Sequence, residues 1–133
     1  YLIKAGIPAN KLVIGAAFYG RMWENVPETR NGLYQSGKFK SFVPYAQFDK
    51  GLNETDGFVF YRDTIAKASY AYNAAQKTFA TFDDALSIQN KTRYTIDKGL
   101  KGIMFWELSL DKPGNGLLDE IHKIKKANNS KAN

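Results

Sequence analysis

Two stretches of the chain consist mainly of consecutive apolar residues. They lack the alternation of apolar and polar residues that marks a strand with one solvent-exposed face. Residues 11–18 read Lys-Leu-Val-Ile-Gly-Ala-Ala-Phe, and residues 101–107 read Lys-Gly-Ile-Met-Phe-Trp-Glu. Such runs are typical of strands that are buried on both faces of a parallel sheet. We therefore expect these two segments to be neighbouring parallel strands.

Helices are predicted next to both strands. The chain begins inside an amphipathic pattern, so we expect the end of a helix that Gly6 caps and Pro8 stops. Asp83 and Asp84 predict the start of a second helix, because carboxylates there accept free backbone N–H groups and favour the helix dipole. Its expected buried contacts are Leu86, Ile88, Tyr94 and Ile96. A third amphipathic helix is predicted over residues 117–124.

The segment over residues 22–82 has a different character, because glycines separate short aromatic runs. Antiparallel strands are predicted at three places in it, 58–62, 68–73 and 77–82. A helix is expected over residues 42–50, where Gly51 breaks it. The segment therefore looks like a small α+β unit inserted between the two parallel strands.

Composition limits the chemistry that is available. With 133 residues, of which 44% are hydrophobic, the chain is long enough for one modest domain. The absence of Cys excludes a disulfide scaffold and a thiolate site, and a single His nearly excludes a His cluster or a Ser-His-Asp triad. We therefore expect no metal and no cofactor. The longest nearly uncharged stretch, residues 12–19, is too short for a membrane span.

The formal net charge of +6 allows a nucleic-acid partner in principle. Much of the excess, however, lies at one end, at Lys123, Lys125, Lys126 and Lys131. No aromatic residues alternate with these lysines as a single-strand platform requires, so a solvated helix end and a tail explain them. A basic nucleic-acid binder stays an alternative that predicts salt-sensitive association with DNA, but we expect no nucleic acid.

The aromatic share of 14% suggests a sugar ligand, because pyranose rings stack their C–H faces on Trp and Tyr. Trp106 and Glu107 end the second predicted strand, and Tyr19 and Arg21 follow the first. In a β/α barrel the carboxyl ends of the strands face the active site. The alternative is that these aromatic residues fill a small core and that Glu107 is a structural partner of a basic residue.

Two motifs at these strands resemble the carboxyl-terminal part of glycoside hydrolase family 18, the chitinase family. Residues 11–21, KLVIGAAFYGR, are similar to the seventh barrel strand of that family. Residues 82–111 carry Phe-Asp-Asp, Ser87, Lys91 and the run GLKGIMFWEL, which is similar to its last helix–strand unit. The resemblance covers nearly the whole chain.

The resemblance implies an α/β fold with an α+β insertion. It identifies residues 1–21 and 83–127 as part of a (β/α)8 TIM barrel, namely its last two β/α units. Residues 22–82 would be the chitinase insertion domain, and residues 128–133 a tail. Because the chain starts at Tyr1, we expect it to be a piece of a larger protein whose remaining barrel is a partner of this piece.

The activity that the resemblance implies is hydrolysis of β-1,4-linked N-acetylglucosamine polymers with retention. The acetamido group of the sugar is then the nucleophile, and a Glu from a D-x-x-D-x-D-x-E motif is the acid. That motif is absent from these 133 residues, so no catalytic residue is assigned. The parent protein is expected to be secreted, periplasmic or on the cell surface. A sugar-binding, lectin-like relative without the acid is the alternative.

Six residues are candidates for sugar contacts on the strength of the resemblance. Trp106 would be the aromatic floor under the sugar that is cleaved, and Glu107 would point away from the barrel centre. Tyr19 and Arg21 would lie on the cleft wall, although Arg21 would alternatively anchor the insertion to the barrel. The other three candidates are Tyr45, which lies in a segment where Gln47 replaces the usual Glu, and Trp23 and Arg30, which are chosen from position and chemistry.

Overall fold

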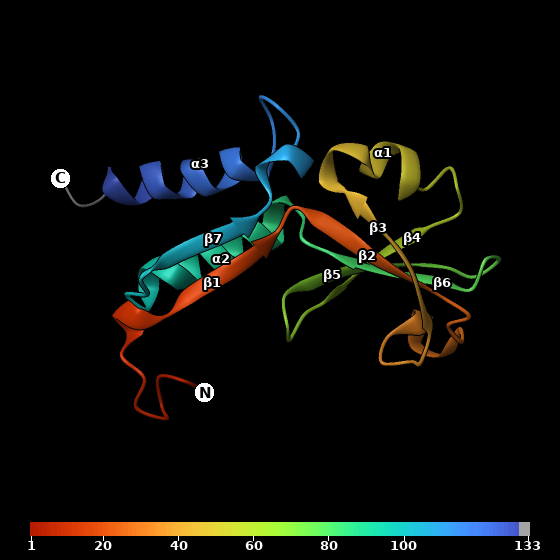
Figure 1. Cartoon of the computed structure of the whole chain (residues 1–133), viewed down its shortest axis with the longest axis horizontal. Coiled ribbons are helices and arrows are strands. Elements are labelled where there is room, and N and C mark those ends of the chain that lie inside the picture. The colour runs from red at the N-terminus through yellow and green to blue at the C-terminus, as the bar shows by residue number, and fades with distance from the viewer. Residues whose placement is uncertain (131–133) are drawn as a thin grey trace.

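The computed structural model describes residues 1–130. It contains two β-sheets of different kinds, one parallel and one antiparallel, together with helices (Figure 1). The first sheet has two parallel strands, β1 (Val13–Ala17) and β7 (Gly102–Trp106). Val13 lies opposite Gly102, and Ala17 lies opposite Trp106. The prediction of two neighbouring parallel strands is therefore confirmed, with β1 starting two residues later than expected.

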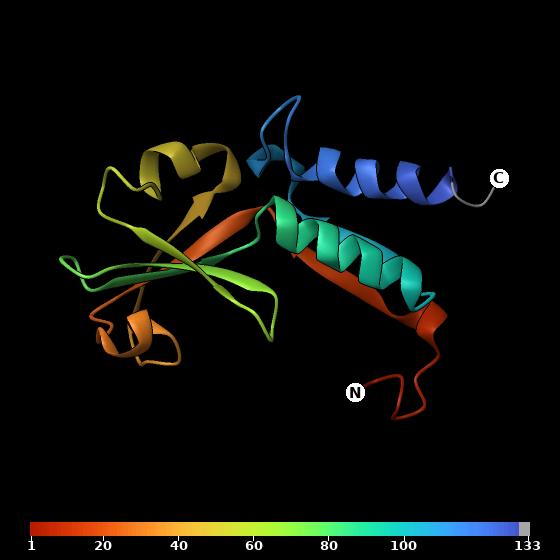
Figure 2. The same ribbon diagram turned by 180° about the vertical axis from the view of Figure 1, so that it is seen from behind.

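Helices cover only one face of this two-stranded sheet. Figure 2 shows α2 (Ala85–Asp97) lying along the sheet, with α3 (Leu117–Asn129) beside it. The buried residues between the sheet and the helices are Ala16, Phe18, Ile88, Leu117 and Ile121. The opposite face is open among the described residues, because Val13, Met104 and Trp106 are all more than half exposed there.

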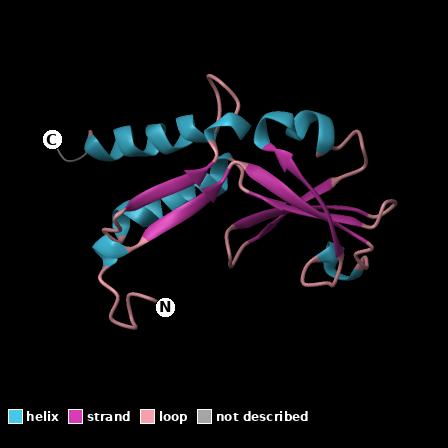
Figure 3. Ribbon diagram, viewed as in Figure 1, coloured by secondary structure: helices cyan, strands magenta, loops and turns pink. Residues whose placement is uncertain are grey.

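The second sheet has five antiparallel strands in the order β3-β2-β6-β5-β4 (Figure 3). Their bounds are Tyr19–Glu24 for β2, Lys38–Pro44 for β3, Val59–Asp63 for β4, Ala68–Asn73 for β5 and Thr78–Phe82 for β6. One face packs on the short helix α1 (Phe48–Gly51). The core there contains Met22, Val43, Phe48, Leu52, Phe58, Ala71 and Ala80.

Four 3₁₀ turns connect these elements. They are η1 (Ala9–Lys11), η2 (Thr29–Gly32), η3 (Tyr45–Gln47) and η4 (Leu108–Leu110). Of these, η3 directly follows β3, and η4 follows β7 after one residue, Glu107. These turns begin the segments that lead from the two strands into α1 and α3.

Strands β4, β5 and β6 confirm the three antiparallel strands that were predicted, to within one residue at each end. The helix expected over residues 42–50 is wrong, because β3 continues to Pro44. Phe42 is 58% exposed and the next residue, Val43, is 7% exposed. Successive residues on opposite faces are the mark of a strand, and only the last part of the segment becomes helical.

The expected helix end at the start of the chain is also wrong. Residues 2–6 form turns, with the Ala5 N–H bonded to the Tyr1 carbonyl at 3.0 Å. Leu2 is 52% exposed, so no apolar packing supports a helix here, and very short helices are marginal without it. Gly6 nevertheless has the left-handed conformation expected of it, with φ at +89°.

The apolar stripe of α2 is narrower than predicted. Ile88 is fully buried, but Leu86 and Tyr94 are 45% and 48% exposed. The other buried positions are Ser87 at the start of the helix and Thr92 and Thr95, and the hydroxyls of the two threonines donate to the carbonyls one turn earlier. Residues 88, 92 and 95 follow helical spacing, so a single stripe faces the sheet and α3.

The five-stranded sheet and helix α3 each extend beyond the segments 22–82 and 83–127 that the resemblance gave. The five-stranded sheet begins at Tyr19, which is three residues before the expected start of the insertion at residue 22. Helix α3 continues to Asn129, two residues into the expected tail. Residues 131–133 of that tail lie outside the described residues.

A buried carboxylate joins the two helices, and we predict that it makes stability depend on pH. Glu120 is 8% exposed and accepts from Gln89 Nε2 at 2.6 Å and from Lys123 Nζ. These bonds hold the pKa of Glu120 below its ordinary value of 4.5. A lowered folded pKa means that the stabilisation is complete above the unfolded pKa and is lost as pH falls through the folded pKa.

The measurement is urea denaturation between pH 7 and pH 3. Glu120→Gln should lower the free energy of unfolding near neutral pH by about 1 kcal/mol and flatten its loss in acid. Glu24→Gln is the matched control, because Glu24 forms only a loose surface pair with Lys38 at 3.6 Å. Equal acid dependence in both variants would show that the bonds of Glu120 do not carry the effect.

Candidate functional site

Trp106 is the last residue of β7, and its indole is exposed although its backbone is fixed. Its neighbour Phe105 packs toward the helices, so alternation places the Trp106 ring on the open face of the sheet. The ring is 62% exposed, whereas the Trp106 carbonyl accepts the Phe18 N–H at 2.9 Å. The peptide bond to Glu107 is cis. A large flat ring is thus presented to solvent from a rigid strand end.

An open groove of about 500 Å³ lies in front of this ring. Both sheets contribute to it, since β7 supplies Trp106 and the first two strands of the five-stranded sheet supply the facing wall. The residues that line the groove are Tyr19, Arg21, Phe39, Phe42, Trp106, Glu107 and Leu110. The lining is thus mainly aromatic, with one cation and one carboxylate.

Alternation along β2 places Tyr19 and Arg21 on the groove side of their sheet. Gly20 between them faces the core, where a Cβ would lie 3.3 Å from Phe82 and from Val43. A side chain at this position would press on both neighbours, so glycine lets them pack closely on the strand. It leaves the larger side chains of Tyr19 and Arg21 free to face the groove.

The guanidinium of Arg21 lies against the aromatic ring of Tyr19. Its guanidinium carbon lies 5.8 Å from the centroid of the Tyr19 ring, which makes an edge contact with Phe42 at 6.4 Å. Arg21 is exposed, and within residues 1–130 no carboxylate forms an ion pair with it. Its N–H donors are therefore available to the oxygens of a ligand.

A row of rings extends from the groove across the five-stranded sheet. Phe39 at the groove contacts Trp23 at 6.3 Å, and Trp23 contacts Phe79 at 6.1 Å. Tyr70 and then Tyr61 continue the row with stacked contacts of 5.6 and 5.2 Å. Trp23 therefore lies directly behind the groove without lining it.

Tyr45 and Arg30 do not line the groove. Tyr45 is half-buried between the two cores, where burial raises the pKa of its hydroxyl and Lys112, 5.5 Å from the ring, opposes that rise. Its N–H donates to the Phe18 carbonyl at 3.0 Å. Arg30 is exposed in η2, in the connection between β2 and β3. Of the six predicted residues, the structure thus brings together Tyr19, Arg21 and Trp106, with Trp23 next to them.

The expected direction of Glu107, away from the barrel centre, stays a prediction. Glu107 borders the groove, and its Oε1 accepts from Ser109 Oγ at 2.7 Å. Strand β7 ends at Trp106, so Glu107 lies outside the strand. Phe39, Phe42 and Leu110 also line the groove but were not predicted from the sequence. A strand assigned to residues 38–44 would have indicated the two phenylalanines.

The described residues offer no metal centre and no membrane-spanning helix. Nowhere in residues 1–130 do three or more His, Cys, Asp or Glu side chains gather as they would around a metal ion. No helix in the same range has both the length and the apolar character needed to cross a membrane.

Sequence comparison identifies a single family. A model described as glycosyl hydrolases family 18 matches residues 1–111. Chitinase A1 of Niallia circulans is 40% identical over 118 residues, which are 83% of this chain and 17% of that protein. The chitinase of Autographa californica nuclear polyhedrosis virus is 32% identical over 83% of this chain and 21% of its own length. The chain thus spans about a fifth of the length of these relatives.

Solved structures show the same likeness. Chitinase ChiA74 from Bacillus thuringiensis superposes with a TM-score of 0.82 at 36% identity, over 92% of this chain and 24% of that one. A family 18 N-acetylglucosaminidase from Paenibacillus barengoltzii gives a TM-score of 0.78 at 39% identity, over 91% of this chain and 35% of that one. The arrangement of both sheets therefore recurs in these proteins.

We predict that truncating Phe18 lowers the free energy of unfolding strongly, whereas truncating Trp106 changes it little. Phe18 is fully buried and stacks on Phe105 at 4.8 Å, so Phe18→Ala should lower the free energy of unfolding by about 3–5 kcal/mol. Trp106→Ala removes an exposed ring and should change it by no more than about 1 kcal/mol. Urea titrations of both variants test this. A large loss for Trp106→Ala would make Trp106 a core residue.

Proposed function

The chain belongs to glycosyl hydrolases family 18, and on this premise we propose that it supplies the aromatic floor and one wall of a chitinase-type sugar cleft. The substrate class is a polymer or oligomer of β-1,4-linked N-acetylglucosamine. The observation that carries the proposal is the exposed Trp106 ring at the carboxyl end of β7, facing Tyr19 and Arg21 across the groove.

In this proposal the two-stranded sheet is part of a TIM barrel. Strands β1 and β7 with helices α2 and α3 are its last two β/α units, covering residues 1–21 and 83–127. The exposed Val13 and Met104 then face the barrel interior, where side chains of the remaining strands pack. The segment over residues 22–82, together with the start of β2, is the chitinase insertion domain.

The groove suits a sugar chain chemically. An indole stacks on the apolar face of a pyranose ring and keeps water away from it. Arg21 donates to hydroxyl or acetamido oxygens, and Phe42 and Tyr19 form the side wall. Trp23 extends the aromatic surface behind Phe39, so it is a more distant candidate contact.

Of the three candidates outside the groove lining, Tyr45 and Arg30 receive other assignments. We assign to Tyr45 a supporting role, because it packs between the two cores and bonds to Phe18. No sugar contact is assigned to Arg30, because it lies on η2 away from the groove lining. The site proposed for the sugar therefore consists of Trp106, Tyr19 and Arg21 with the two phenylalanines of β3.

The reaction assigned to the whole protein is retaining hydrolysis in which the acetamido group of the substrate is the nucleophile. The acid for such a step lies in a D-x-x-D-x-D-x-E motif, which these 133 residues do not contain. Glu107 is not assigned that role, because its carboxylate is engaged by Ser109. This segment then binds and orients the sugar, while the rest of the barrel performs the proton transfer.

We place the whole protein outside the cytoplasm, as a secreted, periplasmic or cell-surface enzyme. Its polymeric substrate is too large to enter a cell. One structural neighbour, chitinase ChiW from Paenibacillus sp. str. FPU-7, is described as cell-surface-expressed and is 39% identical with a TM-score of 0.81.

The test of the floor assignment is Trp106→Ala in the full-length protein. Loss of stacking and of ring distortion should lower kcat/KM for chitooligosaccharides by about 10- to 1000-fold, with little change in melting temperature. Leu86→Ala is the matched control, since it truncates an exposed apolar side chain on α2 away from the groove. Unchanged kcat/KM per folded molecule would overturn the assignment. Sugar binding without any hydrolysis by the unaltered protein would favour the lectin-like alternative.

A second expectation concerns the 133-residue chain by itself. It should not hydrolyse chitooligosaccharides, because the D-x-x-D-x-D-x-E motif that carries the acid is absent from these 133 residues, and Glu107, which borders the groove, is not assigned that role. Reducing-end release measured on the purified chain tests this. Turnover that is lost in Glu107→Gln would identify Glu107 as the acid and contradict the role proposed here.

A further inference from the structure

The chain passes between its two sheets twice, and two adjacent carboxylates lie at the second passage. The first passage is Phe18, between the end of β1 and the start of β2. The second is the pair Asp83 and Asp84, between the end of β6 and the start of α2. The contacts of these two carboxylates reach both sheets.

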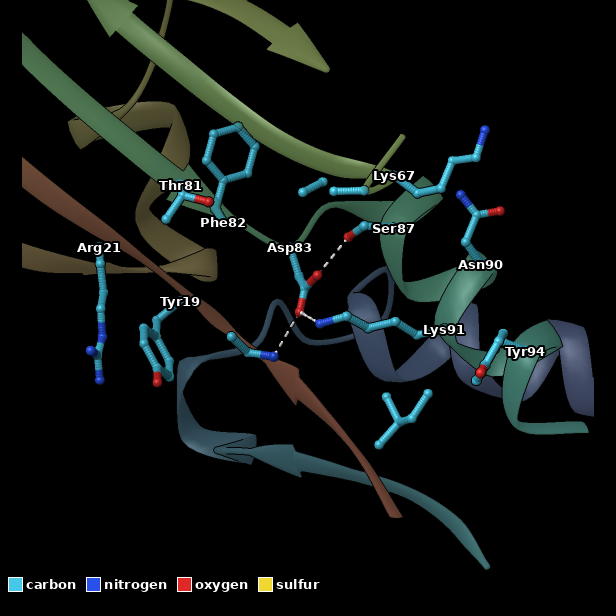
Figure 4. A pocket seen from close by; sticks show the side chains of 14 residues that line it. Tyr19, Arg21, Lys67, Thr81, Phe82, Asp83, Ser87, Asn90, Lys91 and Tyr94 are labelled. Atoms are coloured by element: carbon cyan, nitrogen blue, oxygen red, sulfur yellow. Dashed lines mark hydrogen bonds and ion pairs between the residues drawn. The ribbon is translucent and has the colours of Figure 1, made fainter. Parts of the chain in front are cut away.

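Asp83 ties β1 to α2. Its Oδ2 accepts the Ala17 N–H at 2.8 Å and Lys91 Nζ at 2.6 Å, and its Oδ1 accepts Ser87 Oγ at 2.8 Å (Figure 4). Lys91 also donates to the Gly15 carbonyl at 3.1 Å. Asp83 is only 7% exposed, so these bonds form where water competes little.

Asp84 ties the five-stranded sheet to the start of α2. Its Oδ1 accepts the Ser87 N–H at 2.8 Å, which caps the helix. Its Oδ2 accepts Ser69 Oγ at 2.8 Å and forms an ion pair with Arg62. Ser69 belongs to β5 and Arg62 to β4, so this carboxylate reaches two strands of the second sheet.

Helix capping accounts for only part of this arrangement. A cap needs Asp84 Oδ1 and Ser87, whereas Ala17, Arg62 and Ser69 lie in other elements. Each carboxylate is thus bound to a different sheet, and one peptide unit joins the two. Such a pair resists rotation of one sheet against the other.

We propose that Asp83 and Asp84 are positioning residues that fix the angle between the two sheets and thereby set the width of the groove at Trp106. The groove has one wall from each sheet. Ala17, which Asp83 holds, lies opposite Trp106 in the register of the first sheet. The step to sugar binding rests on the proposed function, but the fixing of the angle does not.

The angle is measurable with spin labels, because the chain contains no cysteine. Ala75→Cys, at the exposed β5–β6 turn, and Lys101→Cys, just before β7, place one label on each sheet. Pulsed electron paramagnetic resonance then gives the distribution of distances between them. Asp84→Asn should widen this distribution, since the Arg62 pair and the Ser69 bond both weaken.

Two further variants keep the test decisive. Arg62→Met removes the partner of Asp84 in the ion pair and leaves the helix cap intact. This variant should therefore fold, and it should also widen the distance distribution. Glu120→Gln is the matched control, because it removes a buried carboxylate that joins α2 only to α3. A distribution in Arg62→Met as narrow as in the parent chain would overturn the proposal.

The consequence for the groove is tested in the full-length protein. Asp84→Asn should raise KM for long chitooligosaccharides, which contact both walls, by about 10- to 100-fold. The value of kcat should change little. For short chitooligosaccharides that reach only Trp106, KM should stay near that of the unaltered protein. A widened distribution with unchanged KM supports the fixed angle and counts against the proposed sugar groove. If the distribution of distances between the labels is unchanged, the proposal that the two carboxylates fix the angle between the sheets is overturned, whatever the kinetics show.

Discussion

The bend at Phe18 is the constraint on which both halves of the molecule depend. Its N–H donates to the Trp106 carbonyl at 2.9 Å, and its carbonyl accepts the Tyr45 N–H at 3.0 Å. Its ring is fully buried and stacks on Phe105 with 4° between the ring planes. Because both backbone groups are bonded, the chain turns from a parallel into an antiparallel sheet within one residue, without leaving a buried polar group unpaired.

The same bend explains why the groove forms where it does. The residue after Phe18 already pairs with β3, while the residue before it still pairs with β7. The ends of two differently oriented sheets therefore meet at one point, and their outward-facing side chains, Trp106 and Tyr19, enclose the space between them. A site built on two rigid strand ends has its rings fixed by backbone hydrogen bonds rather than by loops.

The secondary structure could be predicted from the sequence wherever one local pattern determined it. Residues 102–106 show no alternation, and this alone predicted a parallel strand, although Met104 and Trp106 on one of its faces are more than half exposed among the described residues. Strand β2 was missed because it follows β1 after one residue, so the two read as a single run. In β3 an irregularity in the pairing near Trp23 breaks simple alternation, and Phe39 and Phe42 face the same groove although they are three residues apart. Asp83 was predicted as a helix start, but its bond to Ala17 spans 66 residues, and local pattern does not predict such a contact.

The two explanations of the aromatic content, sugar platform and core filler, apply to opposite faces of the same sheet. Phe48 and Phe82 contact each other at 5.3 Å on the core side, whereas Trp23 and Phe39 contact each other on the other side. In a strand, neighbouring residues point to opposite faces, so an aromatic residue is assigned by its register and not by its type. Phe105 and Trp106 are adjacent and comparably apolar, yet the first packs on Phe18 and the second is 62% exposed. The pairing of β7 with β1 therefore decides which of the two rings is available to a ligand.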